Sequence, residues 1–182
     1  MPISAEDRSR LVALARAVVE AEVKDSPLPP VPAPQGVLTE RRGCFVTLTN
    51  RGHLRGCIGT FQPQEPLALA VMEMAAAAAR DPRFVNRPIT ADELPQLRVE
   101  VSVLSPLVET DKPLDLEVGR HGIYVIRGPY AGCFLPEVAT DMGWSAEEFL
   151  NQCCVSKAGL ATGAWRQSGT RVYLFTSEKF DR

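Results

Sequence analysis

A strand-like run that contains two glycines constrains the fold more than any other stretch: residues 54–60, with the sequence LRGCIGT. Glycine weakens a β-strand, so each of the two predicts a bulge or a point where another group approaches the backbone closely. Arg55 and Cys57 have the same parity and are expected to project from one face of the strand. The run therefore has two interpretations. It is either a site built from a thiol, a cation and bare backbone, or a buried core cysteine beside a surface arginine.

The run belongs to a predicted β-hairpin that covers residues 43–61, with its turn at residues 50–53. A two- or four-residue turn pairs Thr49 with Leu54, and therefore Val46 with Cys57. A three-residue turn would move the two strands out of phase. The first register places one group of side chains on a single face: Cys44, Val46, Leu48, Arg55 and Cys57.

Helices and further strands surround this hairpin. Helices are expected over residues 4–24, with Ser4 as the N-cap, and over the alanine-rich residues 66–80. Residues 97–104 alternate as a half-buried strand, and residues 123–135 predict a second hairpin. Two shorter helices are expected over residues 136–142 and after Ser145, and a final strand over residues 170–177. Hairpins with separate helices predict an α+β fold, a mainly antiparallel sheet packed by helices, with room for a small subdomain.

Composition limits the domain count, the compartment and the partners. With 182 residues, 45% hydrophobic and 23% charged, the chain can bury the core of one domain, expected over residues 37–182. Residues 1–36 are expected to add a helix and a proline-rich connector that pack on this body. The chain shows no secretory signal and no membrane span, and its five cysteines fit no disulfide pattern, so a cytoplasmic location is expected.

Eight short motifs follow one another along the chain. They are residues 43–48 (GCFVTL), 54–60 (LRGCIGT), 81–84 (DPRF), 93–95 (ELP), 101–105 (VSVLS), 121–123 (HGI), 134–139 (FLPEVA) and 157–160 (KAGL). Their order and spacing resemble the AMMECR1 domain family, in the compact prokaryotic branch called protein A of the AmmeMemoRadiSam system. The resemblance implies an AMMECR1-like fold and Memo-like and radical-SAM proteins as partners. The family has no agreed reaction, and the resemblance does not indicate whether a cofactor is used.

The candidate site residues follow from the glycine-containing run and from this resemblance. Cys57 is the candidate nucleophile, redox centre or soft ligand, and Arg55 can lower the thiol pKa or hold an anionic substrate. His121 is the candidate proton carrier, and Glu137 can orient a partner. Ligand binding is assigned to Arg55, Gly56, Gly59 and Glu100, with an ion pair between Arg55 and Glu100 as a hypothesis. No motif for a metal or a nucleotide is present.

Three classes of function remain. The first is the modification of a small molecule or a protein at the Cys57/Arg55 site, within a system shared with Memo-like and radical-SAM proteins. The alternative is a non-catalytic accessory module that binds a small anionic ligand or a partner protein. Nucleic-acid binding is the least favoured, because the net charge is −2 and the pI is about 5.8. Its only local support is one basic group: Arg41, Arg42, Arg51, His53 and Arg55.

Overall fold

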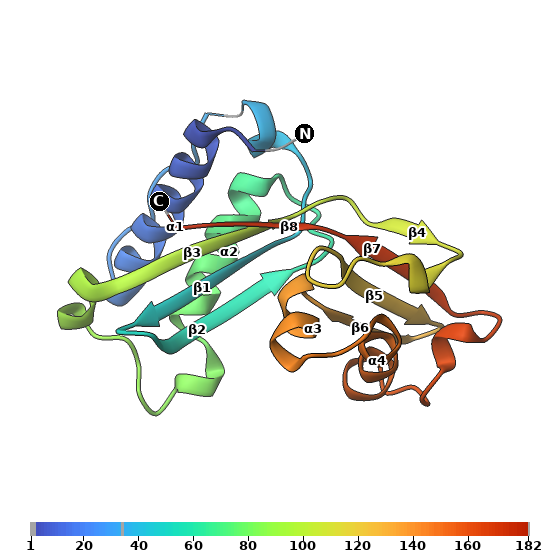
Figure 1. The fold of residues 1–182 in the computed structure, drawn as a ribbon. Helices are drawn as coiled ribbons and strands as arrows, with labels where there is room; N and C mark the ends of the chain where they lie inside the picture. The colour runs from blue at the N-terminus through green and yellow to red at the C-terminus, as the bar shows by residue number, and fades with distance from the viewer. Residues whose placement is uncertain (1–2, 34, 182) are drawn as a thin grey trace. The chain divides into compact units, whose positions relative to one another are not determined.

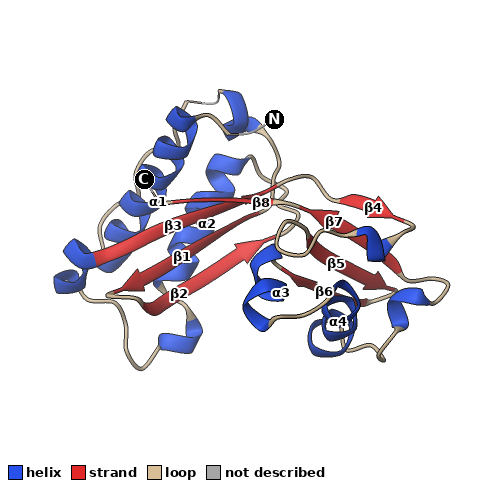
Figure 2. Cartoon of the chain, viewed as in Figure 1, coloured by secondary structure: helices blue, strands red, loops and turns tan. Residues whose placement is uncertain are grey.

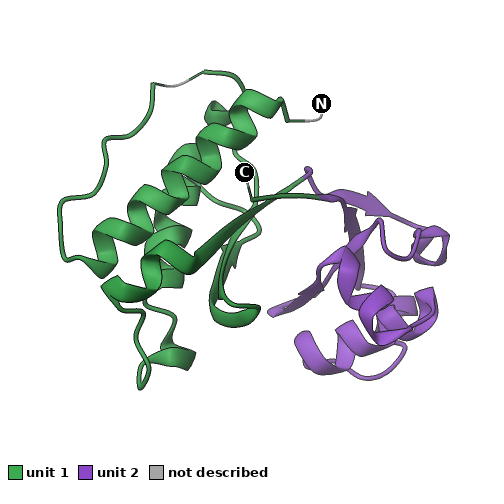
Figure 3. Ribbon diagram, turned by 60° about the vertical axis from the view of Figure 1, so that its left-hand side comes forward, with its two compact units in different colours: residues 1–104, 178–182 green, residues 105–177 purple. Residues whose placement is uncertain are grey.

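The computed structural model describes residues 3–33 and 35–181, and the chain forms two units (Figure 3). Unit 1 comprises residues 1–104 and 178–182, and unit 2 comprises residues 105–177. The N-terminal helix and connector, residues 1–36, fall within unit 1. Their division from residues 37–182 as a separate part stays a prediction. Within the described residues, no helix is both long enough and apolar enough to cross a bilayer.

Unit 1 is a four-stranded sheet with two helices on one face (Figures 1 and 2). The strand order is β2-β1-β3-β8, so β2 is an edge strand. The strands are β1 (Cys44–Asn50), β2 (His53–Thr60), β3 (Leu97–Leu104) and β8 (Ser177–Phe180). The helices α1 (Ala5–Val23) and α2 (Leu67–Ala79) contact each other, and both contact the sheet. The expected helices and the strand over residues 97–104 are thereby confirmed to within a residue or two.

Local chemistry explains why the core of unit 1 forms here. The Ser4 side chain accepts a hydrogen bond from the Asp7 N–H at 3.1 Å and begins α1, as predicted. Alternate residues of β1 are buried, and they face the helix side of the sheet. Helix α2 carries alanines along its length, which allows the helix to approach the sheet closely.

The register of the first hairpin differs from the expected one. Thr49 pairs with Leu54 as predicted, around a two-residue turn in which Arg51 and Gly52 both have positive φ. A bulge between Leu48 and Thr49 then shifts the register by one residue, so that Leu48 lies opposite Gly56 and Cys57 lies opposite Thr47. The expected shared face is therefore wrong. The buried face holds Cys44, Val46 and Leu48, whereas Cys57 lies on the other face with Thr47.

Gly56, the first glycine of the run, lets the backbone of α2 approach β2 closely. A Cβ at this position would lie 2.1 Å from the carbonyl oxygen of Ala78 in α2, and both groups are backbone. Gly59 has a similar role, because its Cβ would lie 2.2 Å from the ring of Phe45. Both glycines thus mark close approaches to the backbone, one of the two alternatives that the sequence predicts, and in both cases the protein itself makes the approach.

Unit 2 contains a second four-stranded sheet, in the order β4-β7-β5-β6. Its strands are β4 (Val108–Thr110), β5 (Gly122–Arg127), β6 (Tyr130–Phe134) and β7 (Arg171–Phe175). Its helices are α3 (Pro136–Met142) and α4 (Ala146–Gln152), and α4 continues into a π-helical turn at Cys153–Lys157. The single final strand expected over residues 170–177 is instead two strands, β7 in this sheet and β8 in the sheet of unit 1.

Every pairing with a described register is antiparallel, so the α+β class is confirmed, with two sheets in place of one. The described residues also contain short 3₁₀ helices: Gly36–Thr39, Pro82–Phe84, Ala91–Gln96, Pro113–Asp115 and Ala164–Arg166. Cys153 and Cys154 are both fully buried in the core of unit 2.

The variant Gly56→Ala should unfold more easily than the wild type, by about 3 kcal/mol, because neither the strand nor the helix backbone can move away from the added methyl group. Urea unfolding at neutral pH measures this difference. Leu54→Ala, an exposed position on the same strand, is the control and should change stability little. Equal stability of Gly56→Ala and Leu54→Ala would contradict the close approach.

Candidate functional site

Cys57 is held by its backbone on the open edge of β2. Its N–H donates to Asp81 Oδ2 at 3.0 Å, and its carbonyl accepts from Arg83 Nη2 at 3.1 Å. Both groups therefore point away from β1, so Cys57 and Thr47 form a pair without hydrogen bonds between their backbones. Two side chains thus take the place of the next strand, and they fix the position of Cys57.

Asp81 and Arg83 also form a tight ion pair with each other. We call these two side chains, together with the Cys57 backbone groups that they bind, the clamp. Arg83 Nε donates to both carboxylate oxygens of Asp81, at 3.0 and 3.2 Å, and Nη2 donates to Oδ2 at 2.6 Å. These bonds hold the pKa of Asp81 well below its usual range, with further help from the N–H groups of Cys57 and Arg83 and against the effect of burial. The Asp81 side chain is 1% exposed, but that of Arg83 is 56% exposed. The guanidinium therefore has one side on the clamp and the other toward solvent.

The Cys57 thiol is half-buried beside a hydroxyl group. Its Sγ lies 3.3 Å from Oγ1 of Thr47. Thr47 lies between Cys57 on β2 and Glu100 on β3, so the three residues form a row across the sheet. Glu100 thus shares a face with Cys57, as predicted. Its ion-pair partner is Lys179, with Nζ 3.7 Å from Oε1.

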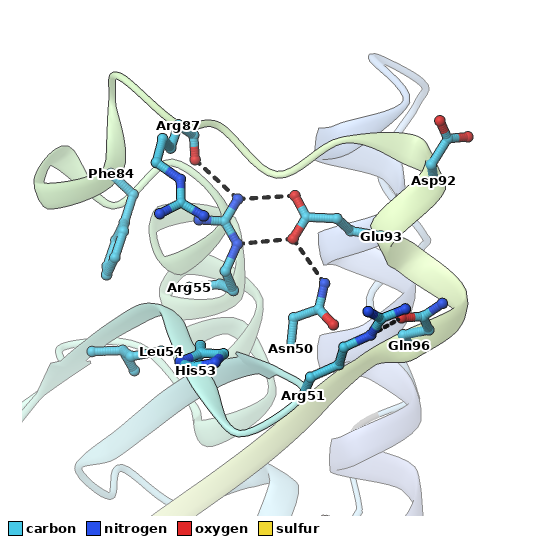
Figure 4. A pocket seen from close by; sticks show the side chains of 10 residues that line it. All are labelled: Asn50, Arg51, His53, Leu54, Arg55, Phe84, Arg87, Asp92, Glu93 and Gln96. Carbon is cyan, nitrogen blue, oxygen red and sulfur yellow. Dashed lines mark hydrogen bonds and ion pairs between the residues drawn. The ribbon is translucent and has the colours of Figure 1, made fainter.

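Arg55 does not form the expected pair with Glu100. It is 7% exposed, and its Nε and Nη2 donate to the two carboxylate oxygens of Glu93, each at 2.9 Å (Figure 4). Nη2 also donates to the backbone carbonyls of Arg87 and Pro88. The hypothesis of an Arg55–Glu100 ion pair is therefore wrong. The bulge makes Arg55 the additional residue of β2, and its side chain reaches the 82–96 segment instead of the Cys57 face.

Glu93 is the anchor of that arrangement. Its pKa is lowered from 4.5 to about 2, chiefly by Arg55, then by the Asn50 side chain and the Thr90 N–H, while burial opposes the shift. Asn50 Nδ2 donates to Oε2 of Glu93 at 2.9 Å. The Arg55–Glu93 pair thereby ties the hairpin turn to the 3₁₀ helix Ala91–Gln96.

Next to this pair is a polar pocket of about 680 Å³. Figure 4 shows its lining: Asn50, Arg51, His53, Leu54, Arg55, Phe84, Arg87, Asp92, Glu93 and Gln96. Cys57 is not among these residues. The sequence predicts Arg55 and Cys57 in one site. In the structure Arg55 lines the pocket, whereas Cys57 is bound by Asp81 and Arg83.

The other two catalytic candidates belong to unit 2. His121 Nδ1 accepts a hydrogen bond from the Glu117 N–H at 3.0 Å, so a neutral ring must carry its proton on Nε2. In this tautomer Nε2 of His121 is a hydrogen-bond donor. Glu137 lies half-buried in the first turn of α3. The catalytic roles of Cys57, His121 and Glu137, and the ligand-binding roles of Gly56, Gly59 and Glu100, stay predictions.

Comparison with known proteins identifies the family. The AMMECR1 family model matches residues 12–180. The chain belongs to the AMMECR1 family. A protein of Methanothermobacter thermautotrophicus is 42% identical over 187 residues, covering 98% of this AMMECR1 chain and 96% of its own length. Protein TK0174 of Thermococcus kodakarensis is 44% identical over 184 residues, covering 94% of this chain and 88% of its own.

A solved structure agrees with the fold of this AMMECR1 chain. The crystal structure of the uncharacterized protein PH0010 from Pyrococcus horikoshii superposes with a TM-score of 0.83 and is 39% identical. The match covers 97% of this chain and 92% of that one. None of these names states an activity, so the function of the AMMECR1 protein has to be argued from its geometry.

Sequence reasoning missed three residues of the AMMECR1 site: Asp81, Arg83 and Glu93. They lie within the quoted motifs DPRF and ELP, but a motif string does not show which backbone groups a side chain will reach. One signal is present in the sequence. A glycine-rich strand with a charged DPR segment directly after the following helix indicates that the charges serve a nearby backbone. Glu93 is part of the motif ELP, whose letters do not show that its carboxylate pairs with Arg55.

In this AMMECR1 protein, Glu93→Gln should lower stability at neutral pH by about 2–3 kcal/mol, because it leaves the buried Arg55 guanidinium without its counter-charge. The folded-state pKa lies below the ordinary value, so the ion pair stabilises the fold above about pH 4.5. Its contribution is lost as the pH falls toward 2. The stability difference between wild type and variant should therefore shrink over this range, as urea unfolding at several pH values can measure. Glu65→Gln, an exposed site, is the control, and a pH-independent difference for Glu93→Gln would contradict the assignment.

Proposed function

We propose that this AMMECR1 protein is a cytoplasmic subunit of a system shared with Memo-like and radical-SAM proteins, in which Cys57 is a reactive thiol that modifies a small molecule or a protein. The observation that carries the proposal is the clamp on Cys57, in which Asp81 and the exposed Arg83 hold the backbone of a half-buried cysteine. All five cysteines are free thiols, in keeping with a reducing compartment.

Comparison with the other cysteines supports this choice of residue. Burial raises the pKa of Cys44 to about 12 and that of Cys133 to about 11. Burial also raises the pKa of Cys153 and of Cys154. These four thiols are therefore protonated at neutral pH, and three of them are fully buried. Cys57 is half-exposed and its backbone carbonyl accepts a hydrogen bond from the Arg83 guanidinium, and partial exposure near a cation is the environment that favours nucleophilic cysteines.

The same geometry replaces Arg55 by Arg83 as the cation of the site. Arg55 donates to Glu93 and to two backbone carbonyls, and it lies in a pocket whose lining does not include Cys57. The pKa of the Arg83 guanidinium is raised chiefly by its hydrogen bond to Asp81, against the effect of burial, and in smaller part by the charges of Asp81 and Cys57.

The proposed chemistry needs a base, and the described residues of unit 1 place only a hydroxyl in hydrogen-bonding contact with the Cys57 sulfur. When the Cys57 sulfur attacks an electrophilic carbon, an S–C bond forms, the leaving group takes the bonding electron pair, and a base accepts the thiol proton. Thr47 Oγ1 is the polar side-chain atom described next to the sulfur, and a hydroxyl is a poor base at neutral pH. An incomplete site of this kind supports a shared system, in which a partner protein contributes the base or the activated substrate.

Alkylation with iodoacetamide at neutral pH, followed by peptide mass spectrometry, tests the thiol. Cys57 should be labelled before the other four cysteines in the folded protein. Arg83→Gln should slow labelling of Cys57 several-fold, because it removes the neighbouring charge. Arg87→Gln removes an exposed arginine of the same loop that does not contact Cys57, so it is the matched control and should leave the rate unchanged.

Two outcomes of this experiment would contradict the proposal. In the first, Cys57 is labelled no faster than Cys133. In the second, Arg83→Gln leaves the labelling rate unchanged or raises it, which would show that Arg83 only covers the thiol. The same assay tests the partners. Adding the Memo-like and radical-SAM proteins of the same organism should protect Cys57 from labelling, and a rate that neither protein changes would argue against the shared system.

A further inference from the structure

The pocket beside the Arg55–Glu93 pair has an excess of positive charge. Three arginines and two carboxylates line it, which leaves one net positive charge with His53 neutral. Arg55 and Glu93 neutralise each other at the base of the pocket. The charges that remain for a ligand are the guanidiniums of Arg51 and Arg87 and the carboxylate of Asp92, which Figure 4 shows at the far edge of the lining.

Arg87 is available for binding. Its backbone carbonyl accepts a hydrogen bond from Arg55 and thereby fixes the start of the side chain. The side chain is exposed, and within residues 3–33 and 35–181 its guanidinium has no hydrogen-bond or ion-pair partner. In Figure 4 it extends from the loop back toward the pocket, beside Arg55. Its charge is therefore not used by the fold.

Arg51 approaches the pocket from the hairpin turn. Its Nε donates to Oε1 of Gln96 at 2.8 Å, which orients the side chain, and its two terminal nitrogens have no partner in the described part of the chain. Its φ is +50°, a region in which this type of turn favours asparagine or glycine. An arginine in this unfavourable conformation points to a use for the guanidinium itself.

We propose that this pocket binds a small oxyanion, a carboxylate or a phosphate group, held between Arg51 and Arg87. Both groups are planar or tetrahedral sets of oxygens that accept paired hydrogen bonds from guanidiniums. The ion pair of Arg55 and Glu93 positions the two segments that carry Arg51 and Arg87, because it joins the hairpin to the loop that carries Arg87. The inference does not depend on Cys57, which lies outside the pocket lining.

NMR titration of the ¹⁵N-labelled protein tests the pocket, with inorganic phosphate in one arm and succinate in the other, at constant ionic strength. Saturable shifts should appear in the amides of residues 50–55 and 84–96 for at least one of the two anions. The arm with the lower dissociation constant identifies the source of the oxyanion. Arg87→Gln should weaken binding about tenfold, as expected for the loss of one charge-assisted hydrogen-bonding group.

Two further variants make the test independent of folding. Arg51→Asn should also weaken binding about tenfold while leaving the melting temperature unchanged or higher, because asparagine suits the positive φ of the turn. Arg41→Gln removes an exposed arginine outside the lining and should leave binding unchanged, and so should Cys57→Ser. Absence of saturable shifts in both arms would overturn the proposal. Equal weakening by Arg41→Gln would overturn it too, since it would show non-specific attraction.

Discussion

The carboxylate of Asp81 is the interaction on which the candidate site depends. It accepts the N–H of Cys57, the N–H of Arg83 and the guanidinium of Arg83, all while almost fully buried. An unpaired buried carboxylate would be costly, so the three donors and the acceptor have to be assembled together. Their assembly closes the open edge of β2 at one residue, and this residue is the cysteine.

A second arginine–carboxylate pair, Arg55 with Glu93, divides the surroundings of β2 into two parts. Both Arg55 and Arg83 lie over the ring of Phe84, with their guanidinium carbons 5.9 and 5.7 Å from its centre. One pair holds the backbone of Cys57 and the other forms part of the pocket lining, so the proposed thiol site and the pocket share one short loop.

The sequence predicted the fold well where the pattern was local. Capping by Ser4, the alternation of residues 97–104 and the alanine-rich α2 all appear as expected, because each depends on neighbours along the chain. The hairpin register failed at the bulge, since one additional residue reverses the face of everything beyond it. For the same reason the partner of Arg55 was misassigned. The contacts of Cys57 with Asp81 and Arg83 are tertiary, and the spacing of residues along a chain does not reveal them.

Residue-resolved hydrogen exchange of the Cys57 amide tests the clamp most directly. An amide that points outward from an edge strand would exchange freely if only water accepted its hydrogen bond. The account predicts that this amide exchanges as slowly as that of Val46 inside the sheet, and that Asp81→Ala abolishes its protection while the protection of Val46 is retained. Rapid exchange of the Cys57 amide in the wild-type protein, or slow exchange that survives Asp81→Ala, would contradict the account.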